Sequence, residues 1–330
     1  MLSRVANSIY WMSRYMERAD NVARFIEVNQ NLMRDADVGA EQQWMPLVHT
    51  SGDHQDFTKR YGEASEENVV RFLAFDSENP NSIFSCIRSA RENARTVREI
   101  ITTTMWNQLN EFYLFVKEMT GNPASIQSLS RFFEQVRRGA NTFKGLTDSS
   151  MTRDETWRFD QLGRFLEIAD KTSRILDVKY FLLLRTANDV GTPFDHIQWG
   201  AVLKSASAFE MYRKKHGRIS PEDVVEFMLL DHQFPRAVRF CLDEAMASLK
   251  AISGAAPGIV TNKSERKLGQ LCSELTYKPV SEIIQGGLHE YLDTLQNRMN
   301  EVGAAIRETF FAHKVPNSYP TASRWGQAQG

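Results

Sequence analysis

Acidic and basic side chains recur at the same spacing in two stretches of this 330-residue chain, residues 14–28 and 164–178. The stretches share six identities: Arg14, Glu17, Ala19, Asp20, Arg24 and Val28 are matched 150 positions later by Arg164, Glu167, Ala169, Asp170, Arg174 and Val178. Carboxylates of this kind can act as general acids or bases, and arginines can hold an acidic substrate. Glu17 and Glu167 are therefore candidate catalytic residues, and the arginines and aspartates beside them are candidate binding residues.

Helical spacing would bring these side chains together in pairs. Residues three or four positions apart are neighbours on a helix, so we expect Asp20 to contact Arg24 and Asp170 to contact Arg174. The Arg and Glu residues three positions apart are expected to be neighbours as well. On a helical projection, the charged residues of the first stretch lie on the arc opposite its apolar residues.

This pattern has two interpretations. The first is a solvated helix face, on which each ion pair contributes about 0.3–0.5 kcal/mol. The second is a packed polar centre, which would be either structural or functional. A solvated face tolerates most polar residues, whereas the second stretch keeps these residue types while its surroundings change. The sequence therefore favours the packed centre.

The similarity between the two halves continues beyond these stretches, at a spacing of 155. The residues that return are Gln43, Trp44, Gly62, Glu67, Val69, Val70, Phe72, Asp76, Pro80, Cys86 and Ala90. A repeat of this length predicts a tandem duplication. We expect one helical unit over residues 1–150, a second over 151–315 packed with it as one domain, and a flexible tail over 316–330.

Apolar periodicity, capping residues and Gly/Pro breaks predict an all-α fold, a helical bundle with pseudo-twofold symmetry. The helices are expected over residues 3–34, 41–61, 66–75, 82–119, 124–141, 154–186, 195–215, 263–275 and 280–311. Loops or turns are expected over residues 35–40, 76–81, 144–151 and 189–194.

A second group of charged residues lies in the stretch from Arg88 to Glu99. Arg91, Arg95 and Arg98 would share one face of the predicted helix and could bind a carboxylate or phosphate, with Glu92 and Asn93 beside them. The second half lacks this arginine cluster. It is either a site kept in one half or a surface that has drifted.

Other kinds of chemistry find little support in the sequence. The histidines form no metal-binding spacing, and no P-loop, G-x-G-x-x-G or G-x-S-x-G motif occurs. We therefore expect no metal and no cofactor in this chain. With 40 Lys and Arg against 41 Asp and Glu, nucleic acid is not an expected partner. Three cysteines, no secretory signal and no apolar run long enough for a membrane predict a cytoplasmic protein.

Four segments together resemble the bacterial alpha-E family: SIYWMSRYMERADNVARF, ENARTVRE, FDQLGRFLEIADKTSRILDVKY and FPRAVRFCL. The resemblance extends from the first residues to about Phe311. It implies an all-helical protein with a glutamate and arginines on the repeated helix, here Glu17, Arg14 and Arg24 and their counterparts Glu167, Arg164 and Arg174. Ala237 stands where the family is expected to carry serine, which leaves Arg236 as the polar candidate of that segment.

The same resemblance implies which proteins are encoded together with this one. Members of the family are encoded beside, or fused to, a circularly permuted ATP-grasp protein, often with a transglutaminase-like protein and sometimes with a proteasome-like peptidase. The favoured hypothesis is a helical partner that binds an ATP-grasp amide ligase or presents its substrate, with ATP and Mg²⁺ bound only by that ligase. The alternative is a stand-alone enzyme that uses Glu17 or Glu167 on an acidic peptide. A purely structural scaffold is a third hypothesis.

Overall fold

The computed structural model describes residues 1–35, 44–121, 129–183, 193–256 and 258–312. These residues form helices and no β-strand, so the fold is all-α as predicted. The helices of the first half are α1 (Ser3–Asp35), α2 (Met45–Ser51), α3 (His54–Tyr61), α4 (Glu66–Val70), the π-helical turn η2 (Arg71–Phe75), α5 (Ile83–Thr96), α6 (Thr103–Gly121) and α7 (Leu129–Ser150). Those of the second half are α8 (Glu155–Leu183), α9 (Pro193–Ser205), α10 (Phe209–His216), α11 (Pro221–Leu229), α12 (Val238–Ser253), α13 (Lys263–Tyr277), α14 (Val280–Gln285), α15 (Leu288–Ile306) and the π-helical turn η5 (Arg307–Phe311).

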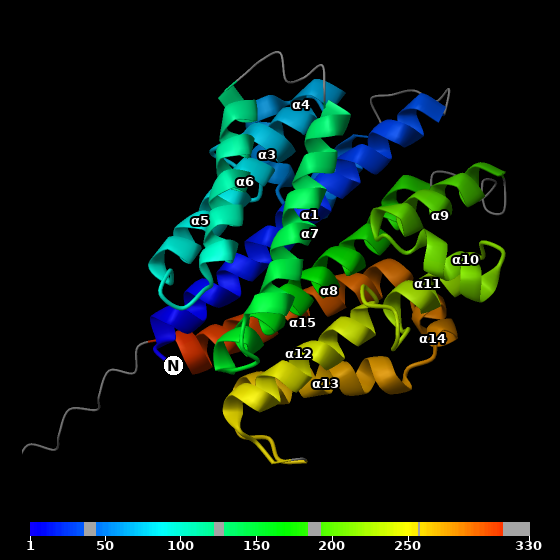
Figure 1. Cartoon of the computed structure of the whole chain (residues 1–330). Coiled ribbons are helices and arrows are strands. Elements are labelled where there is room, and N and C mark those ends of the chain that lie inside the picture. Colours follow the sequence, from blue (N-terminus) through cyan, green and yellow to red (C-terminus); the bar gives the residue numbers. More distant parts are fainter. Residues whose placement is uncertain (36–43, 122–128, 184–192, 257, 313–330) are drawn as a thin grey trace, which may run out of the picture.

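The two long helices α1 and α8 form the centre of the molecule, where they run side by side in the same direction (Figure 1). α5 and α7 pack on α1, and α6 packs behind them. α12 and α15 pack on α8, and α13 packs behind them. Because each long helix is covered by its own group of helices and by the other long helix, its charged arc is buried along with its apolar arc.

The close approach of α1 and α8 depends on Gly163. A Cβ atom at this position would lie 2.4 Å from the main-chain oxygen of Tyr10. Glycine therefore allows the two backbones to touch where any other residue would push them apart. Near the start of both helices, the N-terminal ammonium of Met1 lies 3.0 Å from the Glu155 carboxylate. The C-terminal turn also joins the pair, because Phe311 packs on both Tyr10 and Phe159.

The long helix predicted over residues 82–119 is wrong, because the chain forms two helices there. α5 ends at Thr96 and α6 begins at Thr103. The intervening residues include Val97, Ile100 and Ile101, and β-branched side chains lower helix propensity. The turn also lets α6 fold back on α5 and bury Met105 and Leu109, which a continuous helix could not do.

The connector predicted over residues 144–151 is also wrong, because α7 continues as a helix to Ser150. The apolar spacing of Phe133, Val136, Ala140 and Phe143 continues into this segment, where Thr147 is buried. The Thr147 hydroxyl donates to the carbonyl of Phe143 at 3.0 Å, which removes the cost of burying it. Its polar composition therefore did not prevent a helix.

Three other predicted helices are interrupted where the backbone takes a positive φ. Gly52 separates α2 from α3 (φ 86°), Ser207 lies between α9 and α10 (φ 53°), and Gly287 precedes α15 (φ 95°). The predicted helices over residues 3–34, 66–75 and 154–186 are confirmed within the described part of the chain, which for the last of them ends at residue 183. The loop predicted over 35–40, most of that over 189–194, the start of the helix predicted over 124–141 and the tail over 316–330 lie outside the described residues.

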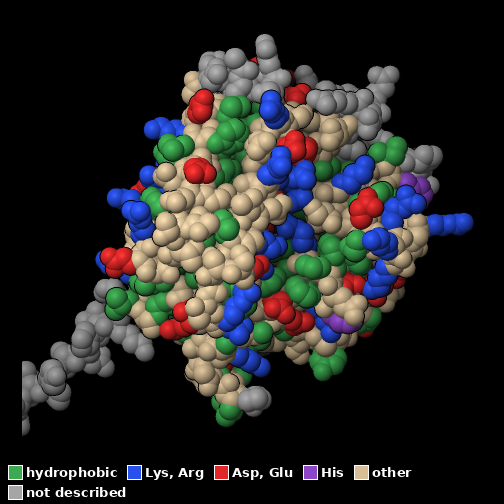
Figure 2. Space-filling view, in the orientation of Figure 1, with side chains coloured by type: hydrophobic (Ala, Val, Ile, Leu, Met, Phe, Trp, Pro, Cys, Tyr) green, Lys and Arg blue, Asp and Glu red, His purple; other side chains and the backbone are tan. Residues whose placement is uncertain are grey.

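None of the described helices combines the length and the apolar character that a membrane span requires. In the orientation of Figure 1, acidic and basic side chains are interspersed over the visible face, and Lys and Arg side chains gather along its middle (Figure 2).

Candidate functional site

The charged arcs of α1 and α8 face each other and form a packed polar centre. Glu167 is fully buried, and Glu17, Asp20, Asp170 and Arg24 are each less than 9% exposed. The interpretation of this pattern as a solvated helix face is therefore wrong. Burying so many charges is costly unless each has a partner, so the contacts of the individual groups decide what the centre can do.

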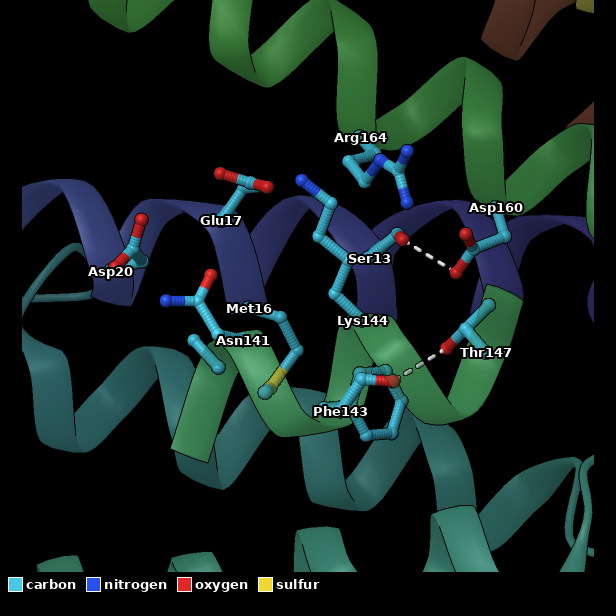
Figure 3. A pocket seen from close by; sticks show the side chains of 11 residues that line it. Ser13, Met16, Glu17, Asp20, Asn141, Phe143, Lys144, Thr147, Asp160 and Arg164 are labelled. Atoms are coloured by element: carbon cyan, nitrogen blue, oxygen red, sulfur yellow. Dashed lines mark hydrogen bonds between the residues drawn. The ribbon is translucent and has the colours of Figure 1, made fainter. Parts of the chain in front are cut away.

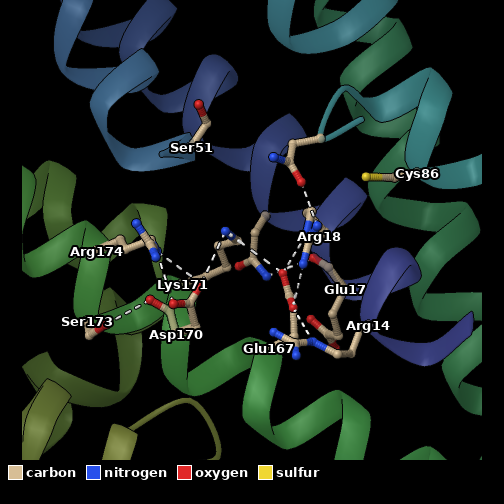
Figure 4. A network of polar contacts seen from close by, with 12 residues as sticks. Arg14, Glu17, Arg18, Ser51, Cys86, Glu167, Asp170, Lys171, Ser173 and Arg174 are labelled. Atoms are coloured by element: carbon tan, nitrogen blue, oxygen red, sulfur yellow. Dashed lines mark hydrogen bonds and ion pairs between the residues drawn. The ribbon is translucent and has the colours of Figure 1, made fainter. Parts of the chain in front are cut away.

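Glu167 is surrounded by positive charge, and we call this group the Glu167 site (Figure 4). The Nε atoms of Arg14 and Arg18 each donate to its carboxylate at 2.7 Å, and the Lys171 ammonium lies 3.8 Å away. Burial alone would raise the pKa of Glu167, but Arg18, Arg14 and Lys171 together hold it well below its usual range. The carboxylate is therefore ionised and has no spare role as a proton acceptor.

Further contacts hold the residues around Glu167 in place. Arg18 also donates to the Asn81 side chain at 2.5 Å, and Asn81 in turn donates to the Asp53 carboxylate at 2.8 Å. Arg14 donates to the Tyr10 hydroxyl at 3.0 Å and packs over the ring of Trp11. These are features of a rigid ion-pair network rather than of an open binding site.

The predicted pairs form only in part. The contacts at spacing four are confirmed, because Arg24 lies 2.7 Å from Asp20, and Arg174 lies 3.0 Å from Asp170. The Arg and Glu residues that were predicted to be neighbours at spacing three form no ion pair with each other in the described part of the chain. Arg14 instead donates to Glu167 on the facing helix α8.

The other glutamate, Glu17, borders a small cavity between α1, α7 and α8, which we call the Glu17 pocket (Figure 3). It is lined by Ser13, Met16, Glu17, Asp20, Ala140, Asn141, Phe143, Lys144, Thr147, Asp160 and Arg164. The cavity measures about 20 Å³, enough for a water-sized group.

Glu17 is much less well paired than Glu167. Its Oε2 atom is buried and accepts no hydrogen bond from any described residue, and the nearest cation, Arg236 Nη2, is 3.5 Å away. The Oδ1 atom of Asp20 is likewise buried without a hydrogen bond in the described part of the chain. The Glu17 pocket therefore contains carboxylate oxygens that remain able to accept a hydrogen bond from a further donor.

The contrast is sharpest when positions 150 apart are compared. The counterpart of Arg14 is Arg164, and the counterpart of Glu167 is Glu17. If the two halves were arranged alike, the contact of Arg14 with Glu167 would be matched by a contact of Arg164 with Glu17. That contact is not made: Arg164 lies 3.3 Å from Asp148 on α7 instead. Equivalent residues are thus arranged as a closed network in one place and as a partly open pocket in the other.

Two side chains of the Glu17 pocket have shifted acidity. Burial raises the pKa of Asp160 to about 6, although Arg164 and a hydrogen bond from Ser13 (2.6 Å) act against the increase. Burial also lowers the pKa of Lys144, which Glu17 opposes and Arg164 and Arg236 reinforce. Groups that change charge nearer to neutral pH are typical of sites that move protons.

The profile of the Alpha-E family, described as "A predicted alpha-helical domain with a conserved ER motif", matches residues 1–311. This chain belongs to the Alpha-E family. An uncharacterized protein of Mycobacterium bovis and uncharacterized proteins of Mycobacterium tuberculosis strains CDC 1551 and H37Rv are each 23% identical to it over 324 residues. Each match covers 92% of this chain but 36% of the relative, so the Alpha-E chain spans about a third of the length of these relatives. No solved structure matches the chain.

A Glu followed directly by an Arg occurs at two places in this Alpha-E chain, Glu17-Arg18 and Glu265-Arg266. Glu265 accepts hydrogen bonds from Thr261 and Asn262 at the start of α13, which is a capping role. Glu17 and Arg18 instead serve the two sites: the carboxylate faces the Glu17 pocket, and the guanidinium neutralises Glu167.

Arg18, Lys144, Asp160 and Lys171 were not among the residues predicted from the sequence. Comparison of the two halves could not identify Arg18, because its counterpart is Ile168. The adjacent Glu-Arg pair was the only signal for it. Lys144 and Asp160 had none, because their importance depends on α7 lying against α1 and α8.

The predicted candidate Arg236 does belong to the centre, where it donates to Asn21 at 3.0 Å and lies 3.3 Å from Asp20. It precedes α12, whose first turn is capped by Ala237 without a side-chain hydrogen bond. Asn81 occupies the position 155 residues earlier and contacts Arg18. Each glutamate thus faces a guanidinium group. For Glu167 it is that of Arg18 on α1, and for Glu17 it is that of Arg236 in the segment before α12.

The predicted arginine cluster lies on α5, apart from both sites. Arg91 contacts Asn110 at 2.8 Å and Glu92 at 2.9 Å, and it packs over the ring of Tyr113. Arg95 is exposed and pairs with Glu92 at 2.8 Å. Arg98 does not share their helix face, since α5 ends before it.

The remaining candidate of this cluster, Asn93, donates to the carbonyl of Ser89 at 2.8 Å.

For metals, no group of three or more His, Cys, Asp or Glu residues within the described ranges is placed to hold an ion.

Asp160 should make the stability of the fold depend on pH. Its pKa is about 6 in the folded chain against an ordinary 3.8, so the folded state binds a proton that the unfolded state has released. This stabilisation is complete below the ordinary value and is lost as the pH rises through about 6. We expect Asp160→Asn to be more stable than the unchanged chain by about 3 kcal/mol near pH 8, and equally stable near pH 4. Urea denaturation of both proteins over this pH range measures the difference, and a gain that is independent of pH would contradict the assignment.

Proposed function

We propose that this Alpha-E chain is a helical partner unit of an ATP-grasp-dependent system that forms amides or modifies peptides. In this proposal it binds the ligase or presents the ligase's substrate. The observation that carries the proposal is the match of the family profile to residues 1–311, together with the length of the relatives, of which the matched region is 36%. Relatives of that length have room for a further protein unit on the same chain, which agrees with the fusion to an ATP-grasp protein that the family resemblance implies.

The dimensions of the Glu17 pocket support a partner role. A cavity of about 20 Å³ admits a water molecule or the end of a side chain, but it cannot enclose a nucleotide. In this proposal ATP and Mg²⁺ are bound by the ATP-grasp partner. A transglutaminase-like protein or a proteasome-like peptidase would act in the same system, and neither nucleic acid nor membrane is a proposed partner. The proposal places the assembly in the cytoplasm, where the cysteines would remain reduced.

We also infer that the chain arose by tandem duplication, with units over residues 1–150 and 151–315. The packing supports this inference, because α5, α6 and α7 surround α1 as α12, α13 and α15 surround α8. One pair of contacts between α1 and α8 agrees with it as well. The counterpart of Tyr10 is Asp160 and that of Gly163 is Ser13, and just as Tyr10 contacts Gly163, Ser13 contacts Asp160. In this view one copy became a structural centre and the other kept an open pocket.

The partner role is tested by co-expressing the chain with an ATP-grasp amide ligase of the same system. We expect the two proteins to co-elute at micromolar concentration in size-exclusion chromatography and ATP consumption to depend on the chain. Glu17→Gln should retain the complex but lose ATP-dependent amide formation, because the carboxylate oxygen that is free of hydrogen bonds in the Glu17 pocket is removed. The matched control is Glu308→Gln, which alters an exposed ion pair with Lys263 and should leave both properties unchanged.

Absence of a complex together with unchanged ATP consumption would contradict the partner role. The second candidate function, a stand-alone enzyme acting on acidic peptides, is favoured by one feature of the site. The Glu17 Oε2 atom, which accepts no hydrogen bond from the described residues, and Asp160, whose pKa is raised to about 6 by burial, border the same cavity. Two carboxyl groups at one cavity can act as base and acid. Turnover of an acidic peptide by the isolated chain without ATP, lost in Glu17→Gln, would support that alternative.

A further inference from the structure

Lys144 is a side chain of the Glu17 pocket for which the ion-pair network offers no role. It lies on α7 and is partly exposed, so it links the cavity to the surface. Figure 3 shows its amino group between the Glu17 carboxylate of α1 and the Arg164 guanidinium of α8. Among the described residues, none accepts a hydrogen bond from this amine or pairs with it within 4 Å, whereas the buried Lys171 lies 3.2 Å from Asp170.

The charges around this amine come from every helix that borders it. They are Glu17 and Asp20 on α1, Asp148 on α7, Asp160 and Arg164 on α8, and Arg236 before α12. Burial lowers the pKa of Lys144, Glu17 opposes this effect, and the guanidinium groups of Arg164 and Arg236 add to it. A larger fraction of the amine is therefore neutral, and hence nucleophilic, than for an exposed lysine at the same pH.

Glu17 lies beyond hydrogen-bond distance of this amine but lines the same cavity, which is large enough for one water molecule to carry a proton from the amine to it. Its Oε2 atom is buried without a hydrogen bond from the described residues and faces the same cavity. Glu167, at the equivalent position, is neutralised by Arg14 and Arg18 and could not do so. A partly exposed amine that shares a cavity with a carboxylate oxygen free of hydrogen bonds, whose one cationic partner is 3.5 Å away, is the arrangement that an activated nitrogen nucleophile needs.

We propose that Lys144 is an acyl acceptor, whose amine takes an acyl group from an acyl phosphate while Glu17 acts as the base. The Nζ atom attacks the carbonyl carbon, and an amide C–N bond forms. The bond between that carbon and the phosphate oxygen breaks, and inorganic phosphate leaves with the electron pair. Glu17 receives the proton that nitrogen loses. This step rests on the proposed function, since an ATP-grasp amide ligase would supply the acyl phosphate from a carboxylate and ATP.

The reactivity of Lys144 can be measured on the full chain alone, with acetyl phosphate as the probe. Brief treatment near neutral pH, followed by peptide mapping with mass spectrometry, gives a relative acetylation rate for each lysine. We expect Lys144 to react about tenfold faster than the exposed Lys117. The buried and ion-paired Lys171 should react more slowly than either.

The role of Glu17 is tested by the same measurement on Glu17→Gln. We expect the Lys144 rate to fall about tenfold while the Lys117 rate stays the same, because the base has been removed. If Lys144 owed its reactivity to a low pKa alone, the rate would stay the same or rise, since Glu17 favours the protonated amine. Should Glu17→Gln fail to fold by circular dichroism, Glu17→Asp keeps the charge but withdraws the carboxylate, and the Lys144 rate should fall there too.

Two results would overturn the inference: acetylation of Lys144 no faster than of Lys117, or an undiminished Lys144 rate in the folded Glu17 variants. Either would leave Lys144 as a cation that lines the pocket without reacting. Failure of the proposed function looks different, because it appears as absence of a complex with the ligase whatever the reactivity of Lys144.

Discussion

Glu167→Gln is expected to lower the free energy of unfolding by about 3–5 kcal/mol. The glutamine keeps the shape of the side chain but removes the charge that neutralises Arg14, Arg18 and Lys171. Arg14 and Arg18, which are largely buried, would then lack their carboxylate partner, and Lys171 would keep only Asp170. Leaving a largely buried charge unpaired costs far more than a lost surface pair. Urea denaturation followed by circular dichroism measures the change.

The matched control for this variant is Glu17→Gln, at the position 150 residues earlier. Its expected cost is smaller, about 1 kcal/mol, because Glu17 has one distant cationic partner and Arg236 would keep Asp20 and Asn21. Equal losses in the two variants would contradict the division into a structural Glu167 site and an open Glu17 pocket. Comparison of the two variants therefore tests the central asymmetry of the molecule by stability alone, without knowledge of a substrate.

Gly163→Ala is expected to destabilise the fold by about 3 kcal/mol, which is unusual for the addition of one methyl group. The new Cβ would lie 2.4 Å from the main-chain oxygen of Tyr10, and a backbone atom cannot turn aside as a side chain can. α1 and α8 would have to separate at the point where they touch. That separation would also loosen the polar centre between them. Thermal and urea denaturation both measure the effect.

Gly145→Ala provides the control for this prediction. Gly145 lies inside α7, and a Cβ there would meet no atom within 4 Å. Alanine should therefore stabilise the helix by about 0.5–1 kcal/mol through its better helix propensity. If Gly163→Ala were as stable as Gly145→Ala, the close contact of α1 with α8 would not be required for the fold.

Local patterns in the sequence predict the elements that they specify directly. The uninterrupted apolar spacing of residues 3–34 and 154–186 predicts α1 and α8, which are both observed. The helix breaks were harder to place. The turn after Thr96 forms because α6 can bury its apolar face against α5, and α7 extends past Lys144 because Thr147 fits into a buried position. Both outcomes depend on packing partners that lie far away in the sequence.

For the candidate site, the sequence was enough to identify a repeated set of carboxylates and guanidinium groups and to favour their burial, because a comparison of two halves reveals which residue types are retained. Only the tertiary structure decides which of them are neutralised. Arg18 reaches Glu167 from the facing helix, while Arg164 turns to Asp148 and leaves Glu17 incompletely paired. The reason is physical: the state of a buried charge depends on the groups within a few ångströms of it, and most of these groups come from other helices.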